Sequence, residues 1–252
     1  QLTGYETDTM TVDGPGGMLR IVLHPPYQTQ AVEITGNRSS TYLDALETRA
    51  VQTLTQKEFQ KAACCNLAES FQTNASVDIT YPDAITGMKQ IQMLGLSGVY
   101  TQITTENLPL IRGLGRVAGL TFIPGVWLNT VRVSKGAGSV ANGYEAITGQ
   151  IDINLKQPHE MEQALFNVYY NSQNRMEGNL VVRQSLNDRW HTAIFLHGSG
   201  RQSTIDDNGD GFLDVPKYRQ LNLANRWKYQ GANGWESELG FQIVEDDQVS
   251  GQ

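Results

Sequence analysis

The stretch that decides the fold is Val131–Lys156, which reads VRVSKGAGSVANGYEAITGQIDINLK. It begins with a short strand pattern and continues through a glycine-broken segment. It ends in a second strand, where Ile151, Ile153 and Leu155 alternate with polar residues. Glycine is used where φ must be positive or where another backbone passes close by. The stretch therefore predicts two strands with a tight glycine-rich connection.

Composition excludes several classes of protein. The 252 residues are 39% hydrophobic, which suffices for one large domain or two smaller ones. The chain contains no run of 18 apolar residues, so no transmembrane helix is predicted. A mean hydropathy of -0.37 fits either a soluble protein or an outer-membrane barrel, whose strands alternate in polarity. A net charge of -7 excludes a nucleic-acid partner. The absence of a Gly-x-Ser-x-Gly elbow, a His-Glu-x-x-His motif and a P-loop argues against an enzyme.

The opening stretch resembles the segment that closes the plug of TonB-dependent outer-membrane receptors, in their Bacteroidetes type. The family pattern I-E-V-x-x-G-P-x-S-x-x-Y-G-x-x-A-I-x-G-x-I-N-I is matched in order by Val131, Val133, Gly136, Ser139, Gly143, Ala146, Ile147, Gly149, Ile151 and Ile153. Two departures are Ala137 at the family's proline and Tyr144 beyond its glycine. The resemblance implies an α+β plug domain, a mixed sheet with short helices, followed by antiparallel transmembrane β-barrel strands.

The resemblance also divides the chain. Residues 1–27 resemble the end of a carboxypeptidase-regulatory-like β-sandwich, 28–38 a TonB-box segment, 39–157 the plug, and 158–252 the first barrel strands. No signal-peptide pattern follows Gln1, so any such peptide is expected to be removed or absent. Five strands cannot close a barrel, so an incomplete barrel fragment is expected.

Val32, Glu33, Ile34 and Thr35 form the apolar core of the predicted TonB box. An extended, β-branched segment can add as a strand to a partner's sheet edge through main-chain hydrogen bonds. The alternative is an ordinary edge strand of the plug. The resemblance implies the TonB-ExbB-ExbD energy-transducing complex as the partner of this segment.

A helix is predicted from Thr55 to Phe71, because Thr55 and Glu58 form a capping box and apolar residues follow at helical spacing. Within it, Cys64 and Cys65 are adjacent, so an unstrained disulfide between them is not expected. Small buried residues are the favoured interpretation, and soft-metal ligation is the alternative.

Residues 91–96 and 100–105 are predicted as a pair of strands. Leu94 stands where the family has an arginine that pairs the plug with the barrel, and Arg112 and Arg116 are candidate substitutes. The loops 81–89 and 108–125 map onto those that touch the ligand in the family. The candidate ligand-binding residues are Asp83, Lys89, Arg112, Arg116 and Phe122. Ordinary solvent-exposed loops are the alternative.

After Pro158 the sequence shows five strand-like runs, with Phe166, Val168 and Tyr170 on one face of the first. Polarity alternates along these runs except in the third, at 190–196, which is apolar on both faces. The connections 186–189 and 230–234 are short, and 198–217 is long, as in an outer-membrane barrel. The long loop fits D-x-N-x-D-G-x-x-D and predicts a Ca²⁺ site from Asp206, Asn208, Asp210, the Phe212 carbonyl and Asp214. Lys217 stands at the twelfth position, so this is no EF-hand, and a plain acidic loop is the alternative.

By resemblance, the expected function is a receptor in the outer membrane, with its plug facing the periplasm and the barrel lumen. It would import a scarce ligand: a ferric siderophore, haem, cobalamin or another metal complex. The expected surroundings are the lipid bilayer and an outer-membrane lipoprotein partner. The alternative is a plug-like docking or structural subunit with no transport of its own, which would not need a TonB box.

Overall fold

The computed structural model describes residues 39–44, 49–61, 66–74, 76–81, 89–109, 111–113, 119–138 and 145–251. The chain divides into two compact units, Gln1–Asn37 and Arg38–Gln252, and the description concerns the second. The predicted sandwich end at 1–27 and the TonB-box segment at 28–38 therefore lie outside the described residues.

A five-stranded sheet is the centre of the first part of this unit. Its order is β1-β2-β7-β8-β6, from β1 (Thr41–Leu43), β2 (Val51–Thr55), β7 (Leu128–Lys135), β8 (Gly149–Leu155) and β6 (Thr101–Thr105). The pair β7 and β8 is antiparallel, and β6 runs parallel to β8. The two strands predicted from the opening stretch are confirmed, and they form the middle of a mixed sheet.

Strand β8 is buried along most of its length because β6 and β7 flank it. Ile151 and Ile153 enter the apolar core. Asp152, expected on a polar face, is also buried, and its carboxylate accepts hydrogen bonds from Thr104 Oγ1 at 2.7 Å and the Asn107 amide at 3.0 Å. A buried carboxylate needs such donors, so Asp152 fixes the turn that follows β6.

Helices and a second, small sheet cover this core. The helical elements are α1 (Gln56–Lys61), α2 (Leu67–Ser70) and the 3-10 turns η1 (Phe71–Thr73), η2 (Gly98–Tyr100) and η3 (Gly125–Trp127). The small sheet has the order β3-β4-β5, from β3 (Asp78–Thr80), β4 (Gln90–Met93) and β5 (Leu96–Ser97). We call the described residues up to 157 the central domain. None of the described helices is long and apolar enough to cross a membrane.

Two secondary-structure predictions are wrong. The helix predicted from Thr55 begins as α1 at Gln56, but it does not continue to Phe71, because Asn66 is extended (φ -141°, ψ 170°) and caps α2 by accepting from the Glu69 amide. Thr55 ends β2, and its hydroxyl bonds the Ser40 carbonyl instead of capping a helix. The strands predicted at 91–96 and 100–105 do not pair, because β4 belongs to the small sheet and β6 to the large one.

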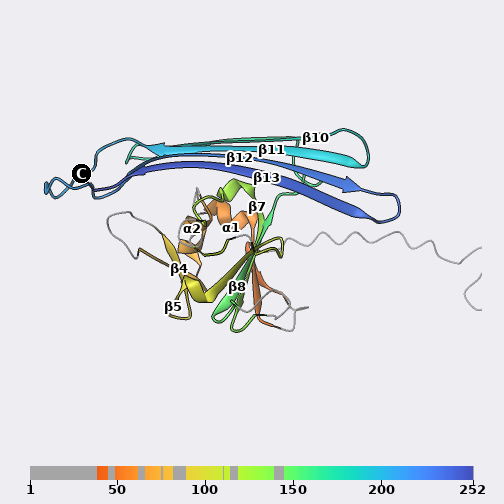
Figure 1. The fold of residues 1–252 in the computed structure, drawn as a ribbon, viewed down its shortest axis with the longest axis horizontal. Helices are drawn as coiled ribbons and strands as arrows, with labels where there is room; N and C mark the ends of the chain where they lie inside the picture. Colours follow the sequence, from red (N-terminus) through yellow and green to blue (C-terminus); the bar gives the residue numbers. More distant parts are fainter. Residues whose placement is uncertain are drawn as a thin grey trace, which may run out of the picture. The chain divides into compact units, whose positions relative to one another are not determined.

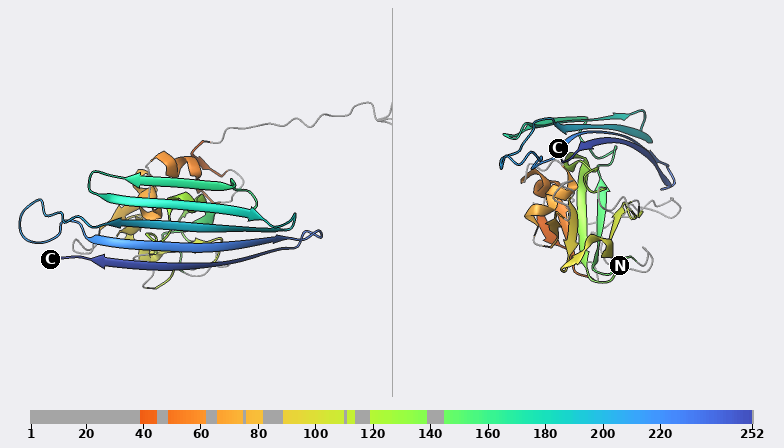
Figure 2. Two further views of the ribbon diagram at one scale, coloured as in Figure 1. Left: turned by 90° about the horizontal axis from the view of Figure 1, so that it is seen from above. Right: turned by 60° about the vertical axis from the view of Figure 1, so that its left-hand side comes forward.

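The last part of the unit is an antiparallel sheet of five strands in chain order, shown in Figures 1 and 2. It consists of β9 (Ala164–Tyr170), β10 (Arg175–Ser185), β11 (Trp190–Arg201), β12 (Lys217–Gln230) and β13 (Glu236–Val249). We call it the long-strand sheet. All five predicted runs are strands, and their long loop lies between β11 and β12 as predicted. The strands form an open sheet, which agrees with an incomplete barrel.

Candidate functional site

The long-strand sheet has an inverted distribution of polarity. On the face toward the central domain, the buried side chains include Glu177, Asn179, His197, Gln220, Asn222 and Arg226, together with Val181, Phe195 and Ala224. On the opposite face, large apolar side chains are exposed: Met176, Leu180, Val182, Ile194, Leu196, Leu221, Leu223, Leu239, Phe241 and Ile243. A soluble sheet would bury the second set and expose the first. This arrangement suits a sheet with a lipid-facing outside and a polar inside.

Aromatic side chains gather at the end of the sheet that carries the short turns. Trp190 packs against Tyr229 at 4.8 Å and Trp227 at 6.5 Å between ring centroids, and Tyr229 also contacts Trp235 at 6.3 Å. These residues flank the turns 186–189 and 231–235. Amphipathic rings of this kind concentrate where a membrane protein crosses the interface between hydrocarbon and water.

An ion-pair network joins the central domain to the sheet near its long-loop end. The Glu69 carboxylate in α2 accepts two hydrogen bonds from Arg175 in β10, at 2.6 and 3.2 Å, and one from Lys89 Nζ at 2.5 Å. Arg175 also donates to Glu177 at 2.5 Å. Burial opposes ionisation of Glu69, but the hydrogen bond and charge of Arg175, together with the charge of Lys89, lower its pKa to about 2. We call Glu69, Lys89, Arg175 and Glu177 the upper latch.

A second ion pair lies closer to the short turns. Arg226 of β12 donates to the Glu106 carboxylate at 2.5 Å and pairs with Glu238 of β13. The same guanidinium donates to the Lys156 carbonyl at 3.4 Å. Apolar contact accompanies these bonds, since the Trp127 ring lies 5.5 Å from the ring of Phe195. The central domain is thus attached to the sheet by ion pairs at two positions along the strands and by an aromatic contact.

The prediction that Arg112 or Arg116 supplies the charge missing at Leu94 stays a prediction, although other ion pairs join the central domain to the sheet. The sheet provides the arginines and the central domain the glutamates, so an arginine at Leu94 is not required for pairing. Leu94 occupies a turn with φ 54° and is exposed. Arg112 lies near Glu145 of the central domain, at 3.6 Å, and Arg116 falls outside the described residues.

Sequence reasoning missed Glu69, Glu106, Arg175 and Arg226. The signal available for the two arginines is strand parity. In β10, Arg175 shares its face with Glu177 and Asn179, opposite Met176 and Leu180. The glutamates lie in a helix and a turn, 106 and 120 residues from their partners, so no local pattern reveals them.

The predicted ligand-binding residues are placed as follows. Asp83 and Arg116 lie outside the described residues. Lys89 is engaged with Glu69 in the upper latch, and Arg112 is half exposed beside Glu145. The Phe122 carbonyl accepts a hydrogen bond from Gln242 of β13 at 3.2 Å. The structure therefore holds Lys89 and Phe122 close to the long-strand sheet, and their role toward a ligand stays a prediction.

The acidic loop closes on its own main chain. Asp206 accepts from the amides of Gly209 at 2.8 Å, Asp210 at 3.2 Å and Gly211 at 3.0 Å. Asp210 accepts from the Phe212 amide, and Asp214 accepts from the Asp207 amide. Within the described ranges, no group of three or more Asp, Glu, His or Cys side chains is arranged to hold a metal ion. Calcium at Asp206, Asn208, Asp210, Phe212 and Asp214 remains a prediction.

Two further predictions concern residues outside the described part of the chain. These are the TonB box, Val32, Glu33, Ile34 and Thr35, and the cysteine pair, Cys64 and Cys65.

The family model described as TonB-dependent Receptor Plug Domain matches residues 45–150. A search of curated protein sequences finds no match. Among solved structures, the chain is similar to the ferric-catecholate import receptor Fiu from E. coli K12 (TM-score 0.61, 18% identity, 79% of this chain and 27% of Fiu). It is also similar to P. aeruginosa FpvA bound to a heterologous pyoverdine (TM-score 0.67, 14% identity, 82% of this chain and 26% of FpvA). The copper transporter OprC is similar as well (TM-score 0.65, 13% identity, 82% of this chain and 33% of OprC). The chain spans a third or less of the length of each, and the likeness at these identities is one of fold.

Proposed function

We propose that this chain, which belongs to the TonB-dependent receptor family of the outer membrane, contributes the plug and the first five barrel strands of a transporter that imports a scarce ligand. In these terms, the central domain is the plug and the long-strand sheet is part of the barrel wall. The observation that carries the proposal is the plug match at residues 45–150, beside a wall that is polar toward the plug and apolar on its open face.

The ligand class is proposed as a metal chelate: a ferric siderophore, haem, cobalamin or another metal complex. The similar structures include a ferric-catecholate receptor, a pyoverdine receptor and a copper transporter, which support this class. Asp83, Lys89, Arg112, Arg116 and Phe122 are the proposed contacts from the plug loops. Charged side chains and an aromatic ring suit an anionic chelate with flat ligand groups.

The plug-to-wall contacts support a plug that is held firmly but can be displaced. Buried ion pairs depend on good geometry, and a small shift of one partner removes most of their attraction. Force applied through the TonB box at Val32–Thr35 is proposed to release such contacts and open a path through the lumen. The energy would come from the TonB-ExbB-ExbD complex. An outer-membrane lipoprotein is proposed as a further partner.

The experiment that tests the proposal is deletion of Val32–Thr35 from the full-length receptor in its native host. Uptake of the metal chelate should be lost, whereas binding of that chelate to the purified receptor should equal the wild type, because the box transmits force and does not contact the ligand. The chelate is first identified by mass spectrometry of molecules that co-purify with the receptor. Unchanged uptake by the deletion variant would contradict the transporter and favour a docking or structural subunit.

A further inference from the structure

A pocket of about 400 Å³ lies where the plug passes into the barrel wall. It is lined by Gln56 of α1, Asn129 of β7, and Lys156, Gln157, Glu160, Met161, Glu162 and Leu165 of the connection to the wall and the start of β9. The connection is tied to the short-turn end of the wall, because Arg183 donates to the carbonyls of Gln163 at 2.9 Å and His159 at 3.2 Å.

Lys156 is the central feature of this pocket. Only 8% of the residue is exposed, yet within the described ranges its ammonium makes no hydrogen bond and no ion pair. Its main chain is fixed from both sides, since its amide donates to the Trp127 carbonyl at 2.9 Å and its carbonyl accepts from Arg226. Burial lowers the pKa of Lys156, and the charge of Glu162 opposes that effect. A buried ammonium without an acceptor is costly, so the site favours an anionic group beside Lys156.

Gln157, which also lines the pocket, has a polar atom without a partner. The Gln157 amide nitrogen donates to Glu106 at 3.3 Å, which fixes the orientation of the amide. Its Oε1 atom is buried and accepts no hydrogen bond from the described part of the chain. Because this oxygen is inaccessible to solvent, a molecule in the pocket would not contact it, and the ligand is inferred from Lys156 and Glu162.

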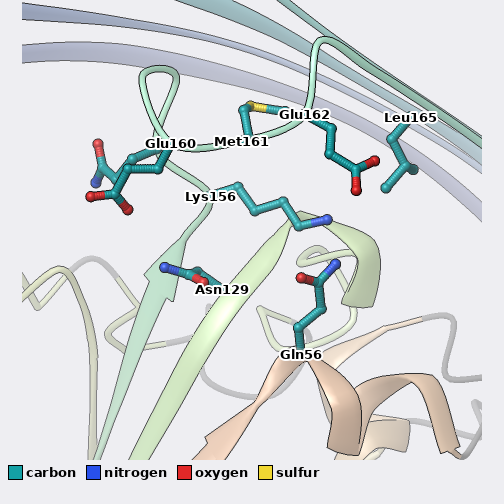
Figure 3. A pocket seen from close by; sticks show the side chains of 8 residues that line it. Gln56, Asn129, Lys156, Glu160, Met161, Glu162 and Leu165 are labelled. Atoms are coloured by element: carbon teal, nitrogen blue, oxygen red, sulfur yellow. The ribbon is translucent and has the colours of Figure 1, made fainter. Parts of the chain in front are cut away.

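The remaining lining residues define which chemical groups a ligand of this pocket would carry. Figure 3 shows the Lys156 ammonium between the Glu162 carboxylate and the Gln56 amide, whereas the Glu160 carboxylate turns away. The register of β7 against β8 slips between Leu128 and Thr130, so Asn129 sits in a bulge, which redirects its side chain. Met161 and Leu165 supply an apolar wall.

From this juxtaposition we propose that the pocket binds a small zwitterion of the amino-acid type. Its carboxylate pairs with Lys156, its ammonium pairs with Glu162, and its apolar side chain packs on Met161 and Leu165. The volume lies at the lower end of the range of small-molecule sites. The ligand would join the plug, through Gln56 and Asn129, to the connection that leads into the wall. This function is separate from ligand import.

The test measures binding of three related molecules to the purified full-length receptor by calorimetry. Leucine carries both charged groups, isocaproate lacks the amine and isoamylamine lacks the carboxylate. Leucine should bind at least about tenfold more tightly than either analogue, because each analogue lacks one of the two charge-assisted contacts. Equal affinity for all three, or no binding of leucine, would overturn the proposal.

Variants assign the two halves of the site. Lys156→Met should bind leucine no better than isoamylamine, and Glu162→Gln should bind it no better than isocaproate. Asp188→Asn is the control and should behave as wild type, because Asp188 is exposed in the turn 186–189 and does not line the pocket. Melting temperatures verify that each variant folds. Full leucine affinity in a folded Lys156→Met variant would show that Lys156 is a packing residue only and would refute the site.

Discussion

The ion pairs of the upper latch contribute to the stability with which the plug is docked against the wall. The fall in the pKa of Glu69 from 4.5 to about 2 corresponds to about 3 kcal/mol, at about 1.4 kcal/mol for each pH unit. Glu69→Gln keeps the size of the side chain and removes the charge that Arg175 and Lys89 share. We therefore expect the variant to weaken docking of α2 by about 3 kcal/mol, since its loss leaves buried cations less well paired.

Hydrogen exchange in the full-length receptor measures this effect. Amides of α2 and η1, such as that of Ser70, should exchange roughly a hundredfold faster in Glu69→Gln, the factor equivalent to about 3 kcal/mol. The matched control is Glu236→Gln, which breaks the solvent-exposed pair with Lys228 and should leave these amides unchanged. In the wild type, the contribution of Glu69 is present above pH 4.5 and is lost as the pH falls from 4.5 toward 2, because its folded pKa is depressed.

Exchange of the α2 amides at the wild-type rate in Glu69→Gln would show that Glu69 does not hold α2 against the wall. A double-mutant cycle with Arg175→Met separates the pair from its surroundings, because a true latch gives a double variant little worse than either single one. Additive effects would show that Glu69 and Arg175 act independently.

Two further predictions concern the plug core and the acidic loop. Gly149→Ala should lower plug stability by about 1–3 kcal/mol in denaturant unfolding, because the added methyl would clash with Met93 and the Ser134 carbonyl. The control is Gly178→Ala, whose added methyl would meet open space. Equal unfolding midpoints for the two variants would contradict this packing. Asp210→Ala should raise protease cleavage of the Asp206–Asp214 loop only when calcium is present, and equal cleavage of the wild type with calcium and with chelator would argue for a plain acidic loop.

Patterns with a short period were readable from the sequence, and contacts over long separations were not. Alternating polarity predicted the wall strands except β11, which was recognised as an apolar run, and the side of β9 that bears Phe166 and Val168 is the exposed one. The glycine-rich stretch located β7 and β8 because its constraint is local. The helix from Thr55 failed at Asn66, where a side-chain cap and a bridge to Pro124 outweigh helical spacing.

The site was less predictable than the fold. Arg175 and Glu69 are ordinary charged residues in sequence, and only the three-dimensional arrangement makes them partners. The pairing of β4 was mistaken because a Leu94–Gly95 turn with positive φ returns the chain to β5, before η2 carries it to the other sheet. The alternation of polarity predicts Lys156 as the polar end of an amphipathic strand, whereas in the structure its side chain is buried.

The four tryptophans are divided in a way that gives the molecule two separate optical reporters. Trp190, Trp227 and Trp235 belong to the aromatic group at the short-turn end of the wall, whereas Trp127 is 1% exposed and packs on Phe195 between plug and wall. Brominated lipids should quench the emission of the first three and spare Trp127. The emission of Trp127 would then follow the seating of the plug, without any added dye.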